Sequence, residues 1–269
     1  MGGAERNARK RRQQQSAGAS KAVTQARGGG DTKKIVAVVI GVVLLAGAVI
    51  GGVLWTNASK NATEGEAIPA AVEPAVEYPV ERDGLVVVSG EQDAPTTIDV
   101  YADFLCPVCA QFEETYGDQI EQKVAAGELK VRTHMLPMLV ERSDPPGYSL
   151  DAANAALCAA DEGQFRAFHD SLFASQPEEG KRGYDKQQLI RLGRDLGIAS
   201  DSFEQCVNNG TYDQQLTAKM EEVKNNPALE QDFGGGNKGF GTPTVVSGGE
   251  IVDFSDPQWL DRLTASGQR

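Results

Sequence analysis

Apolar and polar positions along the chain form three kinds of pattern: one long apolar run, short β-type runs, and runs with helical spacing. The long run, Ile35–Trp55, is uncharged over 21 residues. A helix of that length spans about 30 Å of hydrocarbon, so the run predicts one transmembrane helix. Residues 1–34 are polar without an apolar period and are predicted to form a tail. Residues 56–81 contain three prolines and several acids and are predicted to form a flexible linker.

The folded part is predicted to be residues 82–269, and it begins with alternating strand and helix patterns. Leu85–Val88 and Thr96–Phe104 are rich in β-branched residues and predict strands. Pro107–Ala126 places apolar residues three or four positions apart, which predicts a helix, and Leu129–Leu136 returns to a strand pattern. A strand, a helix and a strand within about 40 residues form a βαβ unit with parallel strands.

Helical spacing then continues from residue 149 to 225, interrupted by glycines and a proline. This pattern predicts an all-helical insert over about residues 140–230. Residues 244–252 predict a hairpin with a glycine turn. Asp256 is expected to cap a last helix that has Pro257 at its first position. These elements together predict an α/β fold in which a helical domain is inserted into a sheet of four or five strands.

Charge is distributed unevenly along the chain. The whole sequence has 26 Lys and Arg against 38 Asp and Glu, a net charge of −12. Residues 1–34 carry nine basic and two acidic side chains, which leaves −19 on the chain after the apolar run. The positive-inside rule therefore predicts a cytoplasmic N-terminus and an extracytoplasmic body at the cytoplasmic membrane. A cleaved signal peptide is the alternative, although signal apolar cores are only about 7–15 residues long. The acidic body argues against nucleic acid as a partner.

The most informative motif is Cys106-Pro107-Val108-Cys109, at the predicted junction between a strand and a helix. Cys106 would lie at the helix N-terminus, where unpaired N–H groups and the helix dipole stabilise a thiolate. Because a thiolate is the attacking species, Cys106 is expected to be the nucleophile. Pro107 suits the first helical position. Cys109, one turn further on, is expected to be buried and to resolve a mixed disulfide.

Two other interpretations of this motif remain. A zinc site is disfavoured because Cys158 and Cys206 are isolated and neither His134 nor His169 lies in a ligand cluster, so no metal is expected. A purely structural disulfide is disfavoured because a C-x-x-C between a strand and a helix is the setting that redox chemistry uses. No cofactor is expected beyond the redox-active disulfide itself.

A second motif is Gly241-Thr242-Pro243-Thr244, which leads into a predicted strand. Proline removes a ladder hydrogen bond, so Pro243 must lie at a strand start or bend. A cis Thr242–Pro243 bond would expose the Thr242 backbone for strand-like pairing with a substrate peptide.

Four further residues are candidates for supporting roles. Asp99 and Asp103 are expected on one face of a strand, where one of them would accept the proton of Cys109; solvated carboxylates are the alternative. Cys158 and Cys206 lie in different predicted helices of the exported part, where disulfides persist. They are predicted to form a structural bridge, with a second redox pair as the alternative.

Three sequence motifs, in this order, resemble the DsbA-like thioredoxin family in its membrane-anchored, extracytoplasmic bacterial form. They are Asp99–Glu113 with the C-x-x-C, Leu157–Phe173, and Gly239–Thr244. The similarity covers roughly residues 82–265. It implies a thioredoxin fold with an inserted all-helical domain, here preceded by the predicted transmembrane helix. It also implies a cis-proline loop at Thr242-Pro243 that faces the substrate.

The resemblance further implies Cys106 as nucleophile, Cys109 as resolving cysteine, and a quinone-linked membrane reoxidase that is DsbB-like or similar to vitamin K epoxide reductase. Val108 departs from the histidine that many strong oxidants of the family carry, and Thr242 resembles the isomerase and reductase branch. The expected function is oxidation of cysteine pairs in unfolded exported proteins. A reductase or isomerase with the same residues is one alternative, and a non-catalytic binding or chaperone module is the other.

Overall fold

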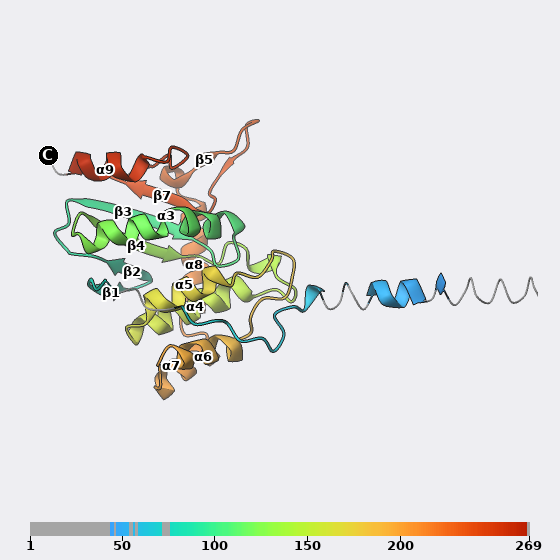
Figure 1. Cartoon of the computed structure of the whole chain (residues 1–269). Coiled ribbons are helices and arrows are strands. Elements are labelled where there is room, and N and C mark those ends of the chain that lie inside the picture. The colour runs from blue at the N-terminus through green and yellow to red at the C-terminus, as the bar shows by residue number, and fades with distance from the viewer. Residues whose placement is uncertain (1–43, 46, 54–55, 57–58, 72–75, 268–269) are drawn as a thin grey trace, which may run out of the picture. The chain divides into compact units, whose positions relative to one another are not determined.

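A computed structural model of the chain describes residues 44–45, 47–53, 56, 59–71 and 76–267 (Figure 1). The chain divides into two units, residues 1–57 and 58–269. In the first unit the described residues are helical. The tail predicted for residues 1–34 lies outside the described residues, as does much of the apolar run Ile35–Trp55. Among the described residues, no helix combines the length and the apolarity that a membrane crossing requires, so the anchor stays a prediction.

Within its described residues, the second unit is built on a sheet of six strands in the order β1-β2-β4-β3-β7-β8. The strands are β1 (Val80–Asp83), β2 (Val86–Ser89), β3 (Thr96–Ala102), β4 (Leu129–Met135), β7 (Thr244–Ser247) and β8 (Glu250–Ile251). Only β3 and β4 pair in parallel; the other pairs are antiparallel. Helix α3 (Pro107–Ala125) connects β3 to β4, which confirms the predicted βαβ unit.

The helical insert lies between β4 and β7 in the sequence, as predicted. Its helices are α4 (Tyr148–Asp161), α5 (Phe165–Ala174), α6 (Lys186–Asp195), α7 (Asp201–Asn209) and α8 (Asp213–Lys224). In Figure 1, α4, α5, α6 and α7 lie below the sheet, whereas α8 packs against the sheet itself. Two short 3-10 turns flank the insert, η1 (Val140–Arg142) and η2 (Pro227–Leu229). A two-stranded ribbon, β5 (Gln231–Asp232) with β6 (Lys238–Gly239), follows the insert and was not predicted.

The last helix, α9 (Trp259–Gly267), begins two residues later than the sequence predicted. Asp256 does accept hydrogen bonds, from the Gln258 N–H to its carboxylate and from the Trp259 N–H to its carbonyl. These bonds close a turn over Pro257, and the helix starts only after that turn.

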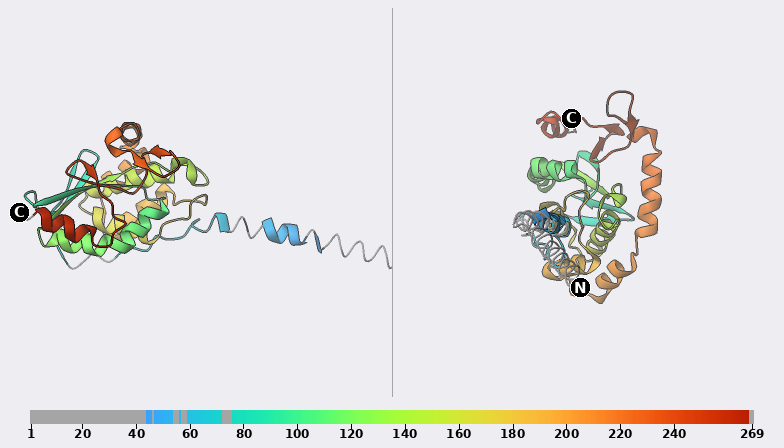
Figure 2. Two further views of the ribbon diagram at one scale, coloured as in Figure 1. Left: turned by 90° about the horizontal axis from the view of Figure 1, so that it is seen from above. Right: turned by 90° about the vertical axis from the view of Figure 1, so that its right-hand side faces the viewer.

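Successive side chains along each strand point to opposite faces of the sheet, and each face is covered by different helices. Ile98 and Val131 share a core with Phe112 of α3 and Trp259 of α9. On the opposite face, Val246 packs with Val223 of α8, Leu136 and Leu229. Figure 2 (right) shows the sheet between orange α8 on one side and green α3 on the other. Between these layers β3 ends at Ala102, and a buried turn over residues 103–106 leads into α3.

Residues 59–71 differ from the flexible linker predicted for 56–81, because they are held against the insert. The side-chain amide of Gln188 donates to the carbonyls of Thr63 and Glu66, at 2.5 and 2.7 Å. Ile68 is 2% exposed and belongs to the core of the insert. The prolines and acids of this segment predict an extended chain. They do not predict that a side chain of the insert, Gln188, donates hydrogen bonds to the backbone carbonyls of the segment.

Candidate active site

The redox motif lies where β3 turns into α3. Cys106 occupies the N-cap position of α3 with extended backbone angles (φ −77°, ψ 115°), and Pro107 follows in the first turn. The turn before it is held by Asp103, whose carbonyl accepts from the Cys106 N–H at 3.0 Å and whose carboxylate accepts from the Leu105 N–H at 2.7 Å. No side chain caps α3, so the first N–H groups of the helix are left for the cysteine sulfur.

Both cysteines are free thiols in this structure, and the two side chains differ in environment. The pKa of Cys106 is lowered to about 6, chiefly because the Cys109 thiol donates a hydrogen bond to its sulfur. The Thr242 side chain and the backbone N–H groups of Cys109 and Val108 also lower it, while burial opposes them. Burial raises the pKa of Cys109 well above its usual range, and the Cys106 sulfur beside it raises it further. One sulfur is therefore ionised near neutral pH while the other keeps its proton.

Thr242 and Pro243 come to this site from the far end of the sequence. Cys106 Sγ lies 3.3 Å from the Thr242 carbonyl oxygen, across 136 residues of sequence, and donates to it when the thiol is protonated. The Thr242–Pro243 peptide bond is cis, and Pro243 is buried at the start of β7. Val108 lies on the outside of the redox turn and is 53% exposed. The structure thus brings together the two motifs that the sequence singled out.

Asp103 is the buried carboxylate of the site. It is fully buried, and it also accepts from the Leu139 N–H at 2.7 Å and the Ser149 hydroxyl at 2.8 Å. Burial raises the pKa of Asp103 to about 6, although these hydrogen bonds oppose the rise; the neighbouring Cys106 adds to it. Asp103 therefore can hold a proton near neutral pH, as the predicted proton acceptor would require.

Asp99 is not placed for that role, which corrects the prediction that the two carboxylates share a face. Strand β3 ends at Ala102, so its alternation does not extend to Asp103. Asp99 instead pairs with Arg132 at 3.0 Å and with His134 at 2.7 Å. Burial raises its pKa, but these hydrogen bonds outweigh burial and the pKa of Asp99 is lowered.

Cys158 and Cys206 form a disulfide that joins α4 to α7, with an S–S distance of 2.01 Å. Cys158 is 1% exposed and lies in the core of the insert. The bond is therefore part of the buried packing of the insert. Within the described residues, no group of three or more His, Cys, Asp or Glu side chains is arranged to hold a metal ion.

Two polar residues near the site were missed by sequence reasoning. Gln176, in the loop after α5, donates through Nε2 to the carbonyls of Phe104 and Cys106, at 3.0 Å each. Glu113 lies one turn after Cys109 on α3, and burial raises its pKa. Neither has a sequence signature, because a lone Gln in a loop and a lone Glu in a helix are ordinary surface residues.

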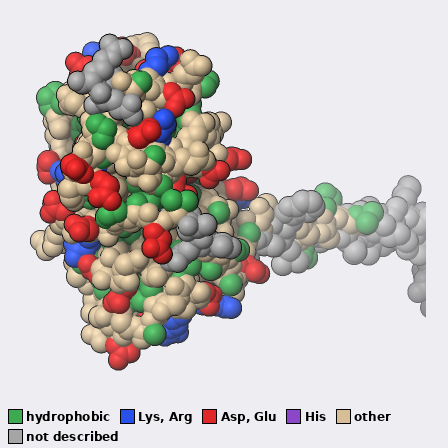
Figure 3. Space-filling view, turned by 60° about the vertical axis from the view of Figure 1, so that its left-hand side comes forward, with side chains coloured by type: hydrophobic (Ala, Val, Ile, Leu, Met, Phe, Trp, Pro, Cys, Tyr) green, Lys and Arg blue, Asp and Glu red, His purple; other side chains and the backbone are tan. Residues whose placement is uncertain are grey.

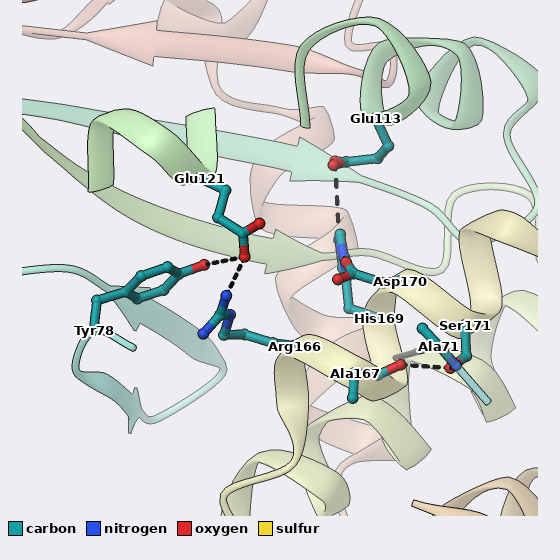
Figure 4. A network of polar contacts seen from close by, with 9 residues as sticks. All are labelled: Ala71, Tyr78, Glu113, Glu121, Arg166, Ala167, His169, Asp170 and Ser171. Carbon is teal, nitrogen blue, oxygen red and sulfur yellow. Dashed lines mark hydrogen bonds and ion pairs between the residues drawn. The ribbon is translucent and has the colours of Figure 1, made fainter. Parts of the chain in front are cut away.

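Glu113 borders a cavity of about 800 Å³ between α3, α5 and the sheet. Figure 4 shows Glu113 facing His169 of α5, with a carboxylate–imidazole distance of 3.9 Å. Burial lowers the pKa of His169, but Asp170 and Glu113 outweigh burial and the pKa is raised. At the other end, Arg166 binds Glu121 and stacks on the Tyr78 ring at 3.9 Å (Figure 4). These contacts tie the segment before β1 to α3 and α5.

Comparisons with known proteins agree with this geometry. The protein-family model described as Thioredoxin matches residues 83–263. Oxidised DsbA of Mycobacterium tuberculosis is similar in structure, with 27% identity, a TM-score of 0.56, and coverage of 67% of this chain and 91% of that one. The reduced disulfide bond oxidoreductase DsbG of the same organism has 28% identity and a TM-score of 0.55, with 77% and 91% covered.

A curated relative is the serine/threonine-protein kinase PknE of Mycobacterium tuberculosis, 32% identical over 195 residues, or 70% of this chain. The alignment covers 33% of that kinase, so the chain spans about a third of the length of the first curated relatives it matches. The predicted resemblance to the DsbA-like thioredoxin family is confirmed by the family match and the two solved structures.

Proposed function

The chain belongs to the thioredoxin family, and from that premise we propose that it is a DsbA-type thiol–disulfide oxidoreductase that oxidises cysteine pairs in exported proteins. One observation carries the proposal: Cys106 has a lowered pKa at the N-terminus of α3, while Cys109 beside it stays protonated. A stabilised thiolate at Cys106 stabilises the reduced enzyme. The enzyme disulfide is then more oxidising than it would be if Cys106 had an ordinary pKa, because its reduction ends in a favoured state.

In the proposed reaction, a substrate thiolate attacks Cys106 Sγ of the oxidised enzyme. The Cys106–Cys109 bond breaks, its electron pair goes to Cys109, and Cys109 takes a proton. A second substrate thiolate then attacks the substrate sulfur of the mixed disulfide, and Cys106 leaves as a thiolate. The low pKa of Cys106 makes it a good leaving group. The substrate has lost two electrons and the enzyme holds the dithiol seen in this structure.

The surroundings of Cys106 support a peptide substrate. The Thr242 carbonyl already contacts the Cys106 sulfur, so a peptide that pairs with the Thr242 backbone would bring its own sulfur to the same place. Phe233 on the β5–β6 ribbon is 58% exposed. Its ring lies against Gly241, directly before Thr242. Phe233 and Val108 offer exposed apolar surface at the two motifs of the site, which suits an unfolded chain.

The proposed location is outside the cytoplasm, with Ile35–Trp55 as a single membrane anchor and the N-terminus inside. The Cys158–Cys206 disulfide supports an oxidising compartment, where such bonds persist. On the face drawn in Figure 3, acidic side chains are spread over the surface and basic ones are few, which does not suit nucleic acid. A membrane reoxidase, DsbB-like or similar to vitamin K epoxide reductase, would accept the two electrons from the dithiol.

A reductase or isomerase is the second candidate function, and Val108 and Thr242 favour it. Alkylation of cells at harvest, followed by mass spectrometry, distinguishes the two by the state of Cys106 and Cys109. The oxidase predicts a disulfide, whereas the reductase predicts a dithiol.

Client trapping tests thiol–disulfide exchange itself. The Cys109→Ala variant should accumulate mixed disulfides, because its Cys106 thiolate can still attack a client disulfide while Cys109 is no longer present to displace the client from Cys106. The double variant Cys106→Ala with Cys109→Ala is the matched control and should trap nothing. If Cys109→Ala also trapped nothing, the chain would be a binding or chaperone module and the proposal would fail.

A further inference from the structure

The redox turn receives hydrogen bonds from outside the thioredoxin part of the fold. Gln176 belongs to the helical insert, between α5 and α6, and its Nε2 reaches the carbonyls of Phe104 and Cys106. An amide NH₂ group has two hydrogens, so it can donate to both at once. The loop of Gln176 is itself fixed, since Pro177 is buried and the Tyr184 hydroxyl donates to the Ser175 carbonyl at 2.8 Å.

The Cys106 carbonyl links the hydrogen bond of Gln176 to the first turn of α3. As the N-cap carbonyl it accepts the first helical hydrogen bonds, from the N–H groups of Cys109 at 3.0 Å and Ala110 at 3.2 Å. Its orientation is set by the same backbone angles that place the Cys106 side chain at the helix N-terminus, where the N–H groups of Val108 and Cys109 interact with the sulfur. A donor that fixes the carbonyl therefore also fixes the sulfur relative to the helix N-terminus.

Asp103 and Gln176 hold the turn from two directions. Asp103 binds the Leu105 and Cys106 N–H groups from within the turn, while Gln176 binds the Phe104 and Cys106 carbonyls from the insert. We propose that Gln176 is a positioning residue by which the helical insert keeps the Cys106 sulfur on the N-terminus of α3. This inference rests on the proposed function, since it concerns the nucleophile of that reaction.

The chain offers a matched control in Gln188. This residue also belongs to the insert, and its side-chain amide also donates to two carbonyls, those of Thr63 and Glu66. Its partners lie in the segment before β1 and not in the redox turn. A Gln→Met substitution removes the donor at either position and keeps the length of the side chain.

The test is the rate at which iodoacetamide alkylates Cys106 as a function of pH, in the reduced full chain. Two titratable groups interact with Cys106, namely Cys109 and Asp103, and both are kept in every variant. Gln176→Met should raise the pKa of Cys106 by about one unit, which lowers the rate at pH 5 by about tenfold. Gln188→Met should leave the profile unchanged.

Two charged variants keep the inference testable if Gln176→Met does not fold. Gln176→Lys retains a donor for the two carbonyls, so the pKa of Cys106 should stay at or below its wild-type value. Gln176→Glu places acceptors against those carbonyls and should raise the pKa.

A profile for Gln176→Met or Gln176→Glu that overlays the wild type would overturn the inference. So would an equal shift in Gln188→Met, because the effect would then reflect general loosening of the insert. If wild-type Cys106 itself titrated as an ordinary thiol, the proposed function would fail, and that result is distinguishable from either of these.

Discussion

Asp103 is the residue at which burial, hydrogen bonding and pH dependence can be tested together. It accepts from two backbone N–H groups and from Ser149, so it cannot be replaced by Ala without leaving buried donors unpaired. Asp103→Asn keeps the shape and one acceptor oxygen but points an NH₂ group at a backbone N–H. One lost partner at a buried site costs about 2 kcal/mol.

The lost hydrogen bond destabilises the Asp103→Asn variant, whereas the raised pKa of Asp103 destabilises the wild type at neutral pH. Its pKa rises from 3.8 to about 6 on folding, so the folded state holds this proton more tightly than the unfolded chain does. The stability it contributes is complete below pH 3.8 and is lost as pH rises through about 6. The full loss is about 3 kcal/mol, of which about 2 kcal/mol falls between pH 4 and pH 7.

The Asp103→Asn variant does not lose this stability as pH rises, because Asn does not titrate. The variant should therefore be about 2 kcal/mol less stable than wild type near pH 4 and equally stable, within about 1 kcal/mol, near pH 7. Urea unfolding followed by circular dichroism at several pH values measures both, with Cys106 and Cys109 reduced in each protein. The Cys106 contribution then largely cancels in the difference.

Asp99→Asn is the matched control, because Asp99 lies on β3, which ends directly before Asp103. The pKa of Asp99 is lowered on folding, so its contribution is present at high pH and is lost as pH falls. The difference in free energy of unfolding between wild type and Asp99→Asn should therefore stay constant or widen as pH rises. A gap for Asp103→Asn that did not narrow from pH 4 to pH 7 would refute the account of Asp103.

Three further outcomes are expected. The free energy of unfolding of reduced wild type, relative to Cys106→Ser, should rise by about 2 kcal/mol between pH 6 and pH 8, because the pKa of Cys106 is lowered on folding from 9.0 to about 6; a flat difference in urea unfolding would contradict this. Replacing Cys158 and Cys206 by Ala opens a loop with a sequence separation of 48 and should cost about 4 kcal/mol in thermal or urea unfolding, yet leave the alkylation profile of Cys106 unchanged. Phe233→Ser should lower kcat/KM for an apolar cysteine peptide about fivefold, since the exposed ring would lose about 1 kcal/mol of contact; an unchanged kcat/KM would remove Phe233 from the substrate surface.

Local sequence patterns were sufficient to predict the scaffold of this site. The β-branched runs and the helical spacing after Pro107 predicted β3, α3 and β4 within one or two residues. Cys106 and Cys109 could be placed at a helix N-terminus because the strand–helix junction is a local feature. The same holds for Pro243, whose position at the start of a strand follows from its missing N–H.

The interactions that tune the site could not be predicted, because they are made between distant segments. Gln176 reaches Cys106 across 70 residues, and Asp103 binds Ser149 across 46. Asp99 was misplaced because β3 ends one residue before Asp103, so a two-residue period was carried past the strand. The sequence of residues 59–71 predicts a linker because their partner, Gln188, lies more than 120 residues away.

The proposed reaction requires that Cys106 is the ionised, attacking sulfur and Cys109 the protonated one. The most direct measurement is alkylation of the reduced wild-type chain across a range of pH, with peptide mass spectrometry to locate the modified cysteine. We expect reaction at Cys106 with a midpoint near pH 6 and an unmodified Cys109. A midpoint above pH 8, or modification of Cys109 first, would contradict this expectation.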